Sequence, residues 1–116
     1  MVTSLAGEIS LEEFMKMVTS CHLFIGNVSG PCHIAGALGI PTLAIFSGQV
    51  LPHEWHPLGH KTLSVRITTS CSPCYKAHPE QCPNDLKCLK FLWPEKVLDA
   101  VYQLMVISGY PIKNTQ

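Results

Sequence analysis

Hydrophobic residues in this chain form short strand-like runs that alternate with segments of helical spacing. Each strand-like run is followed by turn residues and then by a helical or loop segment. The expected strands are residues 22–25, 42–46 and 62–67, and the expected helices are 30–38 and those that begin at Ser10 and at Trp93. Strands that alternate with helices are typical of parallel βαβ units. The pattern therefore predicts an α/β fold with a small parallel sheet flanked by helices.

The organisation that we expect is a single domain over residues 1–116. It includes a cysteine-bearing loop at 68–90 and a frayed tail at 109–116. Three strands are few for a doubly wound sheet, and the chain reaches its first helix almost at once. We therefore expect the later part of a larger α/β domain.

The turn between the first strand and the second helix carries the strongest chemical signal. Ser29 is expected to cap the helix through its hydroxyl, Pro31 suits the first turn, and Gly39 ends the helix. A turn of this kind presents free backbone N–H groups and a positive dipole end to an anion, and phosphate is the expected ligand. The alternative is a tight turn that binds nothing. Ser10 with Glu13 forms a second capping signal, a capping box.

Composition narrows the function classes. The chain has 116 residues with 8 basic and 8 acidic side chains, so its formal charge is zero and no nucleic-acid partner is indicated. No apolar run approaches the roughly 18 residues that a membrane span needs. The first 20 residues lack the pattern of a secretion signal. We therefore expect a cytoplasmic protein.

Six cysteines are many for a chain of this length. Cys21 and Cys32 are expected to be small core residues. The other four lie in the loop at 68–90, where bound zinc, paired disulfides and free thiols all remain open. They are Cys71, Cys74, Cys82 and Cys88. No cysteine is singled out as catalytic.

Histidines and a tryptophan supply further candidates. His33, one turn into the second helix, is expected either to contact a phosphate or to pack against a backbone carbonyl. Glu54 and Trp55 are candidates for a sugar pocket, with Trp55 as a lid over the core as the alternative. Three loop histidines are expected to be solvated rather than metal ligands, and we predict no metal site and no cofactor. They are His53, His56 and His60.

The residues around the turn resemble the donor-site signature of glycosyltransferase family 9, the heptosyltransferases of lipopolysaccharide core synthesis. The matching pattern is Asn27-x-Ser29-Gly30-Pro31-x-His33-x-Ala35-x-Ala37-Leu38-Gly39-x-Pro41. Further segments resemble the family in the same order: Leu5-Ala6-Gly7 with Ser10-Leu11-Glu12-Glu13, Trp55-x-Pro57-x-Gly59, and the cysteine-bearing loop. One position departs from the family pattern, because Val28 stands where an acidic residue is usual. A valine cannot hydrogen-bond donor hydroxyls, so Val28→Asp is expected to favour a nucleotide-sugar.

The resemblance implies a GT-B architecture of two Rossmann-like domains, of which this chain resembles the later part of the C-terminal, donor-binding one. The implied ligand is a nucleotide-sugar such as an ADP-heptose, and the lipopolysaccharide-type acceptor and the catalytic base belong to an N-terminal domain. The residues implied at the donor are Asn27, Ser29, Gly30, Pro31 and His33. The chain alone is expected to be inactive and to carry no catalytic residue. The alternatives are a non-catalytic binding module stabilised by zinc or disulfides, and a decayed gene product.

An incomplete Rossmann-like sheet also predicts exposed apolar surface and self-association or a partner chain. The residues expected to be underprotected are Leu5, Leu23, Phe24, Leu43 and Ile45.

Overall fold

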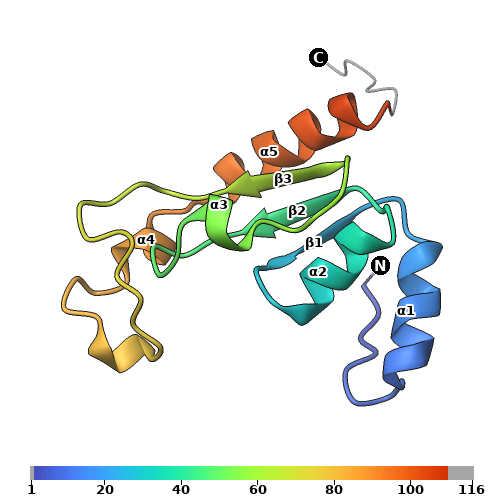
Figure 1. Cartoon of the computed structure of the whole chain (residues 1–116), viewed down its shortest axis with the longest axis horizontal. Coiled ribbons are helices and arrows are strands. Elements are labelled where there is room, and N and C mark those ends of the chain that lie inside the picture. Colours follow the sequence, from blue (N-terminus) through green and yellow to red (C-terminus); the bar gives the residue numbers. More distant parts are fainter. Residues whose placement is uncertain (1, 110–116) are drawn as a thin grey trace.

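The computed structural model describes residues 2–109 and contains a parallel sheet of three strands in the order β1-β2-β3 (Figure 1). The strands are β1 (Phe24–Asn27), β2 (Thr42–Ile45) and β3 (Thr62–Val65). The longer helices are α1 (Leu11–Thr19), α2 (Gly30–Ala37) and α5 (Pro94–Ile107). The short ones are α3 (Pro52–Trp55), α4 (Lys87–Lys90) and the 3-10 helix η1 (Pro79–Gln81). The predicted α/β class and the parallel sheet, a partial Rossmann-like fold, are confirmed.

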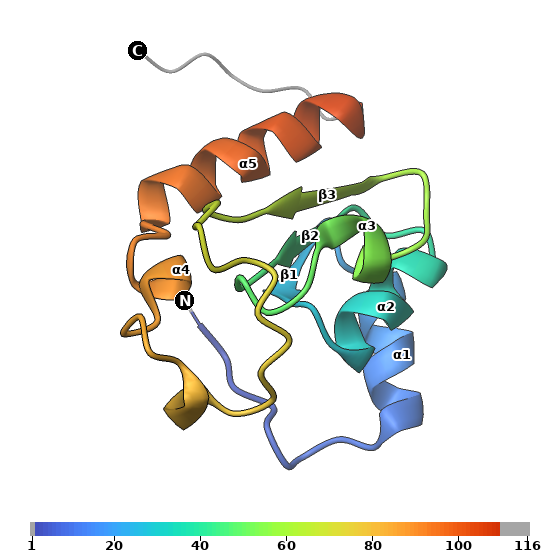
Figure 2. The same cartoon turned by 60° about the vertical axis from the view of Figure 1, so that its left-hand side comes forward.

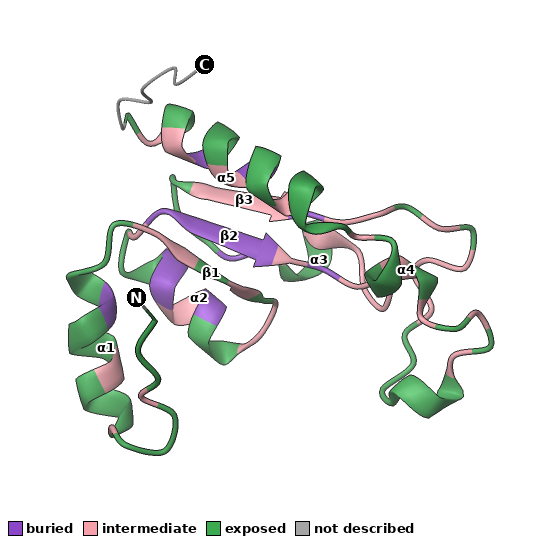
Figure 3. Ribbon diagram, turned by 180° about the vertical axis from the view of Figure 1, so that it is seen from behind, coloured by how far each residue is buried: buried purple, intermediate pink, exposed green. Residues whose placement is uncertain are grey.

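Helices cover both faces of the sheet (Figure 2). Successive side chains of a strand point to opposite faces, and β2 shows this clearly. Leu43 packs with Val65 and Leu104 toward α5, whereas Ala44 and Phe46 pack with Cys32 toward α2. Since both faces of β2 are covered, it is the most deeply buried strand (Figure 3). The core is thus two small clusters divided by the central strand.

The burial of Leu43 corrects one prediction. Leu43 was expected to be underprotected, but it is fully buried because it lies on the central strand beneath α5. The other four residues of that prediction are half-buried, namely Leu5, Leu23, Phe24 and Ile45.

Exposed apolar surface does occur beside β1. The helix α5 packs on β2 and β3, which leaves Ile25 of β1 46% exposed on that face. A groove of about 510 Å³ runs between Ile25 and α5, and it is lined mainly by apolar side chains. They include Leu92, Val97, Leu98 and Val101. The predicted surface is therefore present, at Ile25 rather than at Leu43.

Local signals at the helix ends are largely confirmed. Ser10 and Glu13 form the predicted capping box, with each side chain bonded to the other's backbone N–H at 3.1 Å. Gly39 ends α2 with a φ of +82°, a conformation that glycine adopts without steric cost. The Ile40 N–H then donates to the Ala35 carbonyl at 3.1 Å, as in a Schellman motif.

Several element boundaries differ from the prediction: β1 runs to Asn27 rather than residue 25, β2 ends at Ile45 rather than residue 46, and β3 ends at Val65 rather than residue 67. The strand β1 begins at Phe24 rather than at residue 22, because the Phe24 N–H makes the bond to the Pro41 carbonyl that opens the ladder. The segment 49–59 contains α3, and the loop 68–90 contains η1 and α4, none of which was expected. The predicted frayed tail lies, apart from Gly109, outside the described residues.

Candidate functional site

The predicted phosphate turn joins the carboxyl end of β1 to the start of α2. Ligands of open parallel sheets bind at this end of the strands. The N–H of His33 donates to the Ser29 carbonyl at 3.1 Å, which closes the first turn of the helix. Among the described residues, no acceptor engages the N–H of Gly30 or of Cys32. A Cβ built on Gly30 would meet nothing within 4 Å, so the front of the turn is open.

Ser29 occupies the N-cap position, but its predicted capping bond is absent. Its hydroxyl instead donates to the Asn27 carbonyl at 3.2 Å, and its backbone is fully extended with a φ of −166°. The prediction of a side-chain cap is therefore wrong. The cause is local competition, because a serine hydroxyl can bond to a carbonyl two residues away as readily as to a helix N–H. The helix thus keeps donors for an outside partner.

His56, which was expected to be solvated, is a structural residue. Its ring nitrogens contact the hydroxyls of Ser64 and Thr62, the latter at 2.7 Å, so His56 ties the segment after α3 to β3. Burial lowers the pKa of His56, and the charge of His33 lowers it further. The half-buried His33 lies in the first turn of α2. The role of His33 toward a phosphate remains a prediction.

The sugar-pocket candidates on α3 behave differently from one another. Glu54 accepts hydrogen bonds from the Leu51 N–H at 3.1 Å and from the Tyr75 hydroxyl at 2.8 Å. These two bonds, the Tyr75 one foremost, lower the pKa of Glu54. Trp55 is 54% exposed, so it is no closed lid over the core. The structure therefore gives Glu54 a structural role in joining α3 to the cysteine loop, and a contact of either residue with sugar remains a prediction.

A close backbone contact that the sequence did not reveal holds α2 in place. A Cβ on Gly36 would lie 2.7 Å from the Leu58 carbonyl oxygen, and a Cβ on Gly59 would lie 2.6 Å from the Gly36 oxygen. Gly59 also has a φ of +143°, and Pro57 is fully buried. The Trp55-x-Pro57-x-Gly59 segment thus positions α2 by packing. The only sequence signal for this was a glycine inside a helical segment.

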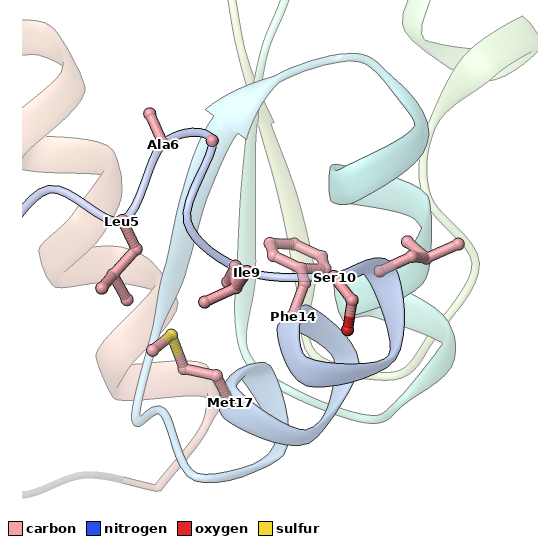
Figure 4. Close-up of a pocket in the computed structure, with 8 residues that line it drawn as sticks. Leu5, Ala6, Ile9, Ser10, Phe14 and Met17 are labelled. Atoms are coloured by element: carbon pink, nitrogen blue, oxygen red, sulfur yellow. The ribbon is translucent and has the colours of Figure 1, made fainter.

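Other surfaces offer less to an anion. A pocket of about 430 Å³ between the N-terminal segment and α1 is lined mainly by apolar side chains, such as Leu5, Ile9, Phe14 and Met17 (Figure 4).

Within residues 2–109, no three His, Cys, Asp or Glu side chains are arranged to hold a metal ion. None of the helices formed by these residues is long and apolar enough to cross a membrane.

The cysteines divide as predicted only in part. Cys32 is fully buried, and this burial raises the pKa of its thiol. Cys21 is exposed just after the end of α1, so its predicted core position is wrong. The four loop cysteines are half-buried free thiols.

Val28, the departure from the family signature, packs beside the Cys32, Ala44 and Phe46 cluster. Its N–H donates to the Ile45 carbonyl at 3.1 Å and so extends the ladder beyond β1. The side chain is therefore part of the packing under the turn.

Comparison with known proteins identifies a family for this chain. The family model for glycosyltransferase family 9 (heptosyltransferase) matches residues 1–84. The chain is 31% identical over 104 residues, 89% of its length, to lipooligosaccharide heptosyltransferase 2 of Campylobacter jejuni, and spans 32% of that protein. It is 30% identical over 106 residues, 91% of its length, to lipopolysaccharide heptosyltransferase 2 of Salmonella typhimurium, and spans 30% of it.

No solved structure matches the chain, so the similarity to known proteins rests on sequence comparison alone. The chain spans about a third of the length of these relatives. The match covers the strand, turn and helix of the candidate site and most of the cysteine loop. It does not favour the alternative of a non-catalytic binding module. The sequence signature, the parallel sheet and the family match together show that the chain belongs to glycosyltransferase family 9, the heptosyltransferase family.

Proposed function

We propose that this chain forms the later part of the donor-binding domain of a heptosyltransferase-like enzyme of lipopolysaccharide core synthesis. In this proposal residues 1–116 are one unit of a GT-B fold that works in the cytoplasm. The donor is a nucleotide-sugar of the ADP-heptose class, and its pyrophosphate binds at the start of α2. The residues assigned to it are Asn27, Ser29, Gly30, Pro31 and His33.

The observation that carries this proposal is the open turn at the carboxyl end of β1. The N–H groups of Gly30 and Cys32 have no acceptor within the described chain, and nothing fills the space before Gly30. Two such donors at the positive end of a helix suit a diphosphate. Because the Ser29 hydroxyl bonds only within the turn, it can rotate toward a ligand without uncovering a helix N–H.

The turn would assist the transfer itself. When the sugar leaves the nucleotide, the diphosphate gains negative charge in the transition state. Fixed N–H dipoles that face this charge lower the barrier, because they need no reorganisation during the reaction. In the proposal the acceptor site and the base belong to the rest of a full-length enzyme, and this chain alone forms no product.

ADP binding by a variant with one added methyl group at the turn tests the proposal. Gly30→Ala places a Cβ in the open space before the turn without touching any protein atom. We expect ADP affinity to fall at least about tenfold, since hydrogen bonds to charged phosphate oxygens are lost. Ala37→Ser, at the exposed far end of α2, is the matched control and should bind ADP like the unaltered chain. Calorimetric titration measures both.

Two results would contradict the proposal. One is equal ADP affinity of Gly30→Ala and the unaltered chain. The other is equal affinity for ADP and adenosine, because the phosphates would then contribute nothing. Far-UV circular dichroism of Gly30→Ala checks that the variant is folded.

A further inference from the structure

The cysteine loop encloses a cavity that the donor site does not use. Residues 68–90 extend past the carboxyl ends of the strands and fold back toward the segment after β2 (Figure 1). The cavity between them measures about 170 Å³. Three of the four loop cysteines line it: Cys74, Cys82 and Cys88. Cys71 lies outside the lining, with its sulfur 3.3 Å from the Thr69 hydroxyl.

Two of these cysteines lie close to one glycine. The Cys74 N–H donates to the Gly48 carbonyl at 3.1 Å. A Cβ built on Gly48 would lie 3.3 Å from the Cβ of Cys88. The two arms of the loop, which carry Cys74 and Cys88, therefore meet at Gly48. Two further bonds fix the first arm, from the Tyr75 N–H to the Gln49 carbonyl at 2.8 Å and from the Gln49 side chain to the Lys76 carbonyl at 2.6 Å.

The third thiol has an environment that favours its anion. The Cys82 sulfur accepts the N–H of Asn84 at 3.4 Å. This bond, together with a backbone bond from Leu86 and the charge of Lys76, lowers the pKa of Cys82. By contrast, burial raises the pKa of Cys32. The thiolate is the nucleophilic form of cysteine, so these contacts favour Cys82 as the reactive member of the set.

The arrangement suits thiol exchange better than metal binding. Within residues 2–109, no three candidate ligands are placed to hold a metal ion, although three cysteines line one cavity. A reactive thiolate with neighbouring thiols is the arrangement in which a first modification is resolved to a disulfide.

We propose that this cavity is a thiol-modification site at which a small disulfide oxidises the loop. The Cys82 thiolate attacks one sulfur of the reagent, the reagent's S–S bond breaks, and one thiolate leaves and takes a proton from water. The thiolate of Cys74 or Cys88 then attacks the Cys82 sulfur, and the second half of the reagent leaves as a thiol. The protein loses two electrons and two protons, and the reagent gains them as two thiols. The new disulfide closes the loop beside the segment that follows β2.

The probe is 2-hydroxyethyl disulfide, which is small and uncharged. The purified chain is exposed to it, quenched in acid and analysed by intact mass and peptide mapping. We expect a product that has lost two hydrogen atoms and in which Cys82 is linked to Cys74 or Cys88. A product with its first label on Cys21 or Cys71, or a tightly bound zinc ion on the loop thiols, would overturn the proposal.

Variants separate the two steps. Cys82→Ser should slow the first step at least about tenfold, because the reactive thiolate is absent. Replacing Cys74 and Cys88 together by Ser should stop the reaction at a mixed disulfide on Cys82. Cys21→Ser is the control and should behave like the unaltered chain. Undiminished oxidation of Cys82→Ser would overturn the proposal.

A measurement on the unaltered chain does not depend on any variant folding. Limited alkylation with iodoacetamide, followed by peptide mapping, should label Cys82 before Cys71 and before the buried Cys32. Labelling of Cys71 ahead of Cys82 would overturn the assignment of the reactive thiol.

Discussion

The Tyr75 hydroxyl donates a hydrogen bond of 2.8 Å to the Glu54 carboxylate and so joins the cysteine loop to α3. The bond lowers the pKa of Glu54 and raises that of Tyr75. A carboxyl group whose pKa is lowered by folding stabilises the fold fully at pH values above its ordinary, unfolded pKa. This stabilisation is lost as the pH falls through the lowered pKa of the folded state. The contact is therefore expected to persist at neutral pH, to fail in acid when Glu54 is protonated, and to fail in strong alkali when Tyr75 loses the proton that it donates.

Tyr75→Phe tests this contact. Without the hydroxyl, the pKa of Glu54 should rise toward its ordinary range, because the largest cause of its depression is gone. An NMR titration of the side-chain carboxyl carbon measures this change. Tyr102→Phe, a half-exposed tyrosine of α5, is the control. An unchanged Glu54 titration in Tyr75→Phe would show that the bond does not form in solution.

The core on the α5 side should depend on Leu104. This side chain is fully buried against Leu43 and Val65, so Leu104→Ala removes contacts and leaves a cavity. We expect the free energy of unfolding to fall by about 2–5 kcal/mol. Leu98→Ala, at a position 50% exposed on the same helix, should cost less than about 1 kcal/mol. Urea unfolding compares the two, and equal losses would mean that α5 does not pack as described.

The packing of Val28 changes the result expected for Val28→Asp from a gain in nucleotide-sugar affinity to a loss of stability. Val28 packs beside the Cys32, Ala44 and Phe46 cluster, where a carboxylate would lose solvent. We expect the variant to lose roughly 1–3 kcal/mol of unfolding free energy. Val2→Asp, at an exposed position, is the control and should be near neutral. A gain in nucleotide-sugar affinity at unchanged stability would instead show that residue 28 faces the sugar.

Self-association should involve the β1 edge. The Phe24 N–H donates to the Pro41 carbonyl just before β2, and the Val28 N–H donates to the Ile45 carbonyl of β2. The N–H groups of Ile25 and Asn27 therefore point away from β2. A second copy can pair with this edge and cover the groove beside Ile25. Sedimentation velocity should show concentration-dependent dimers, and Ile25→Lys should shift them to monomers. Ile107→Lys, at the exposed end of α5, should leave them intact. Monomers of the unaltered chain at all concentrations would contradict this.

Local patterns sufficed for much of the fold. The parallel sheet, the Ser10 capping box and the end of α2 at Gly39 all follow from spacing and turn chemistry within a few residues. The burial of Leu43 did not, because it depends on α5, which lies far along the chain.

The candidate site, like the fold, was predictable where it depends on neighbouring residues and not where it depends on contacts between distant segments. The turn at Ser29 was found from its sequence, since glycine and proline fix such turns locally. The Glu54 to Tyr75 bond and the ties of His56 to β3 join residues from different segments, and no periodicity encodes them. The Ser29 hydroxyl could bond either to the Asn27 carbonyl or to a backbone N–H of α2, and the sequence does not decide between these two partners.

The most direct test of the donor site is an NMR titration of the isotopically labelled chain with ADP and, separately, with adenosine. If the start of α2 binds the pyrophosphate, the backbone amides of Gly30, Cys32 and His33 should shift with ADP and stay in place with adenosine. Shifts confined to the cysteine loop, or the absence of any shift at millimolar ADP, would contradict a donor site at this turn.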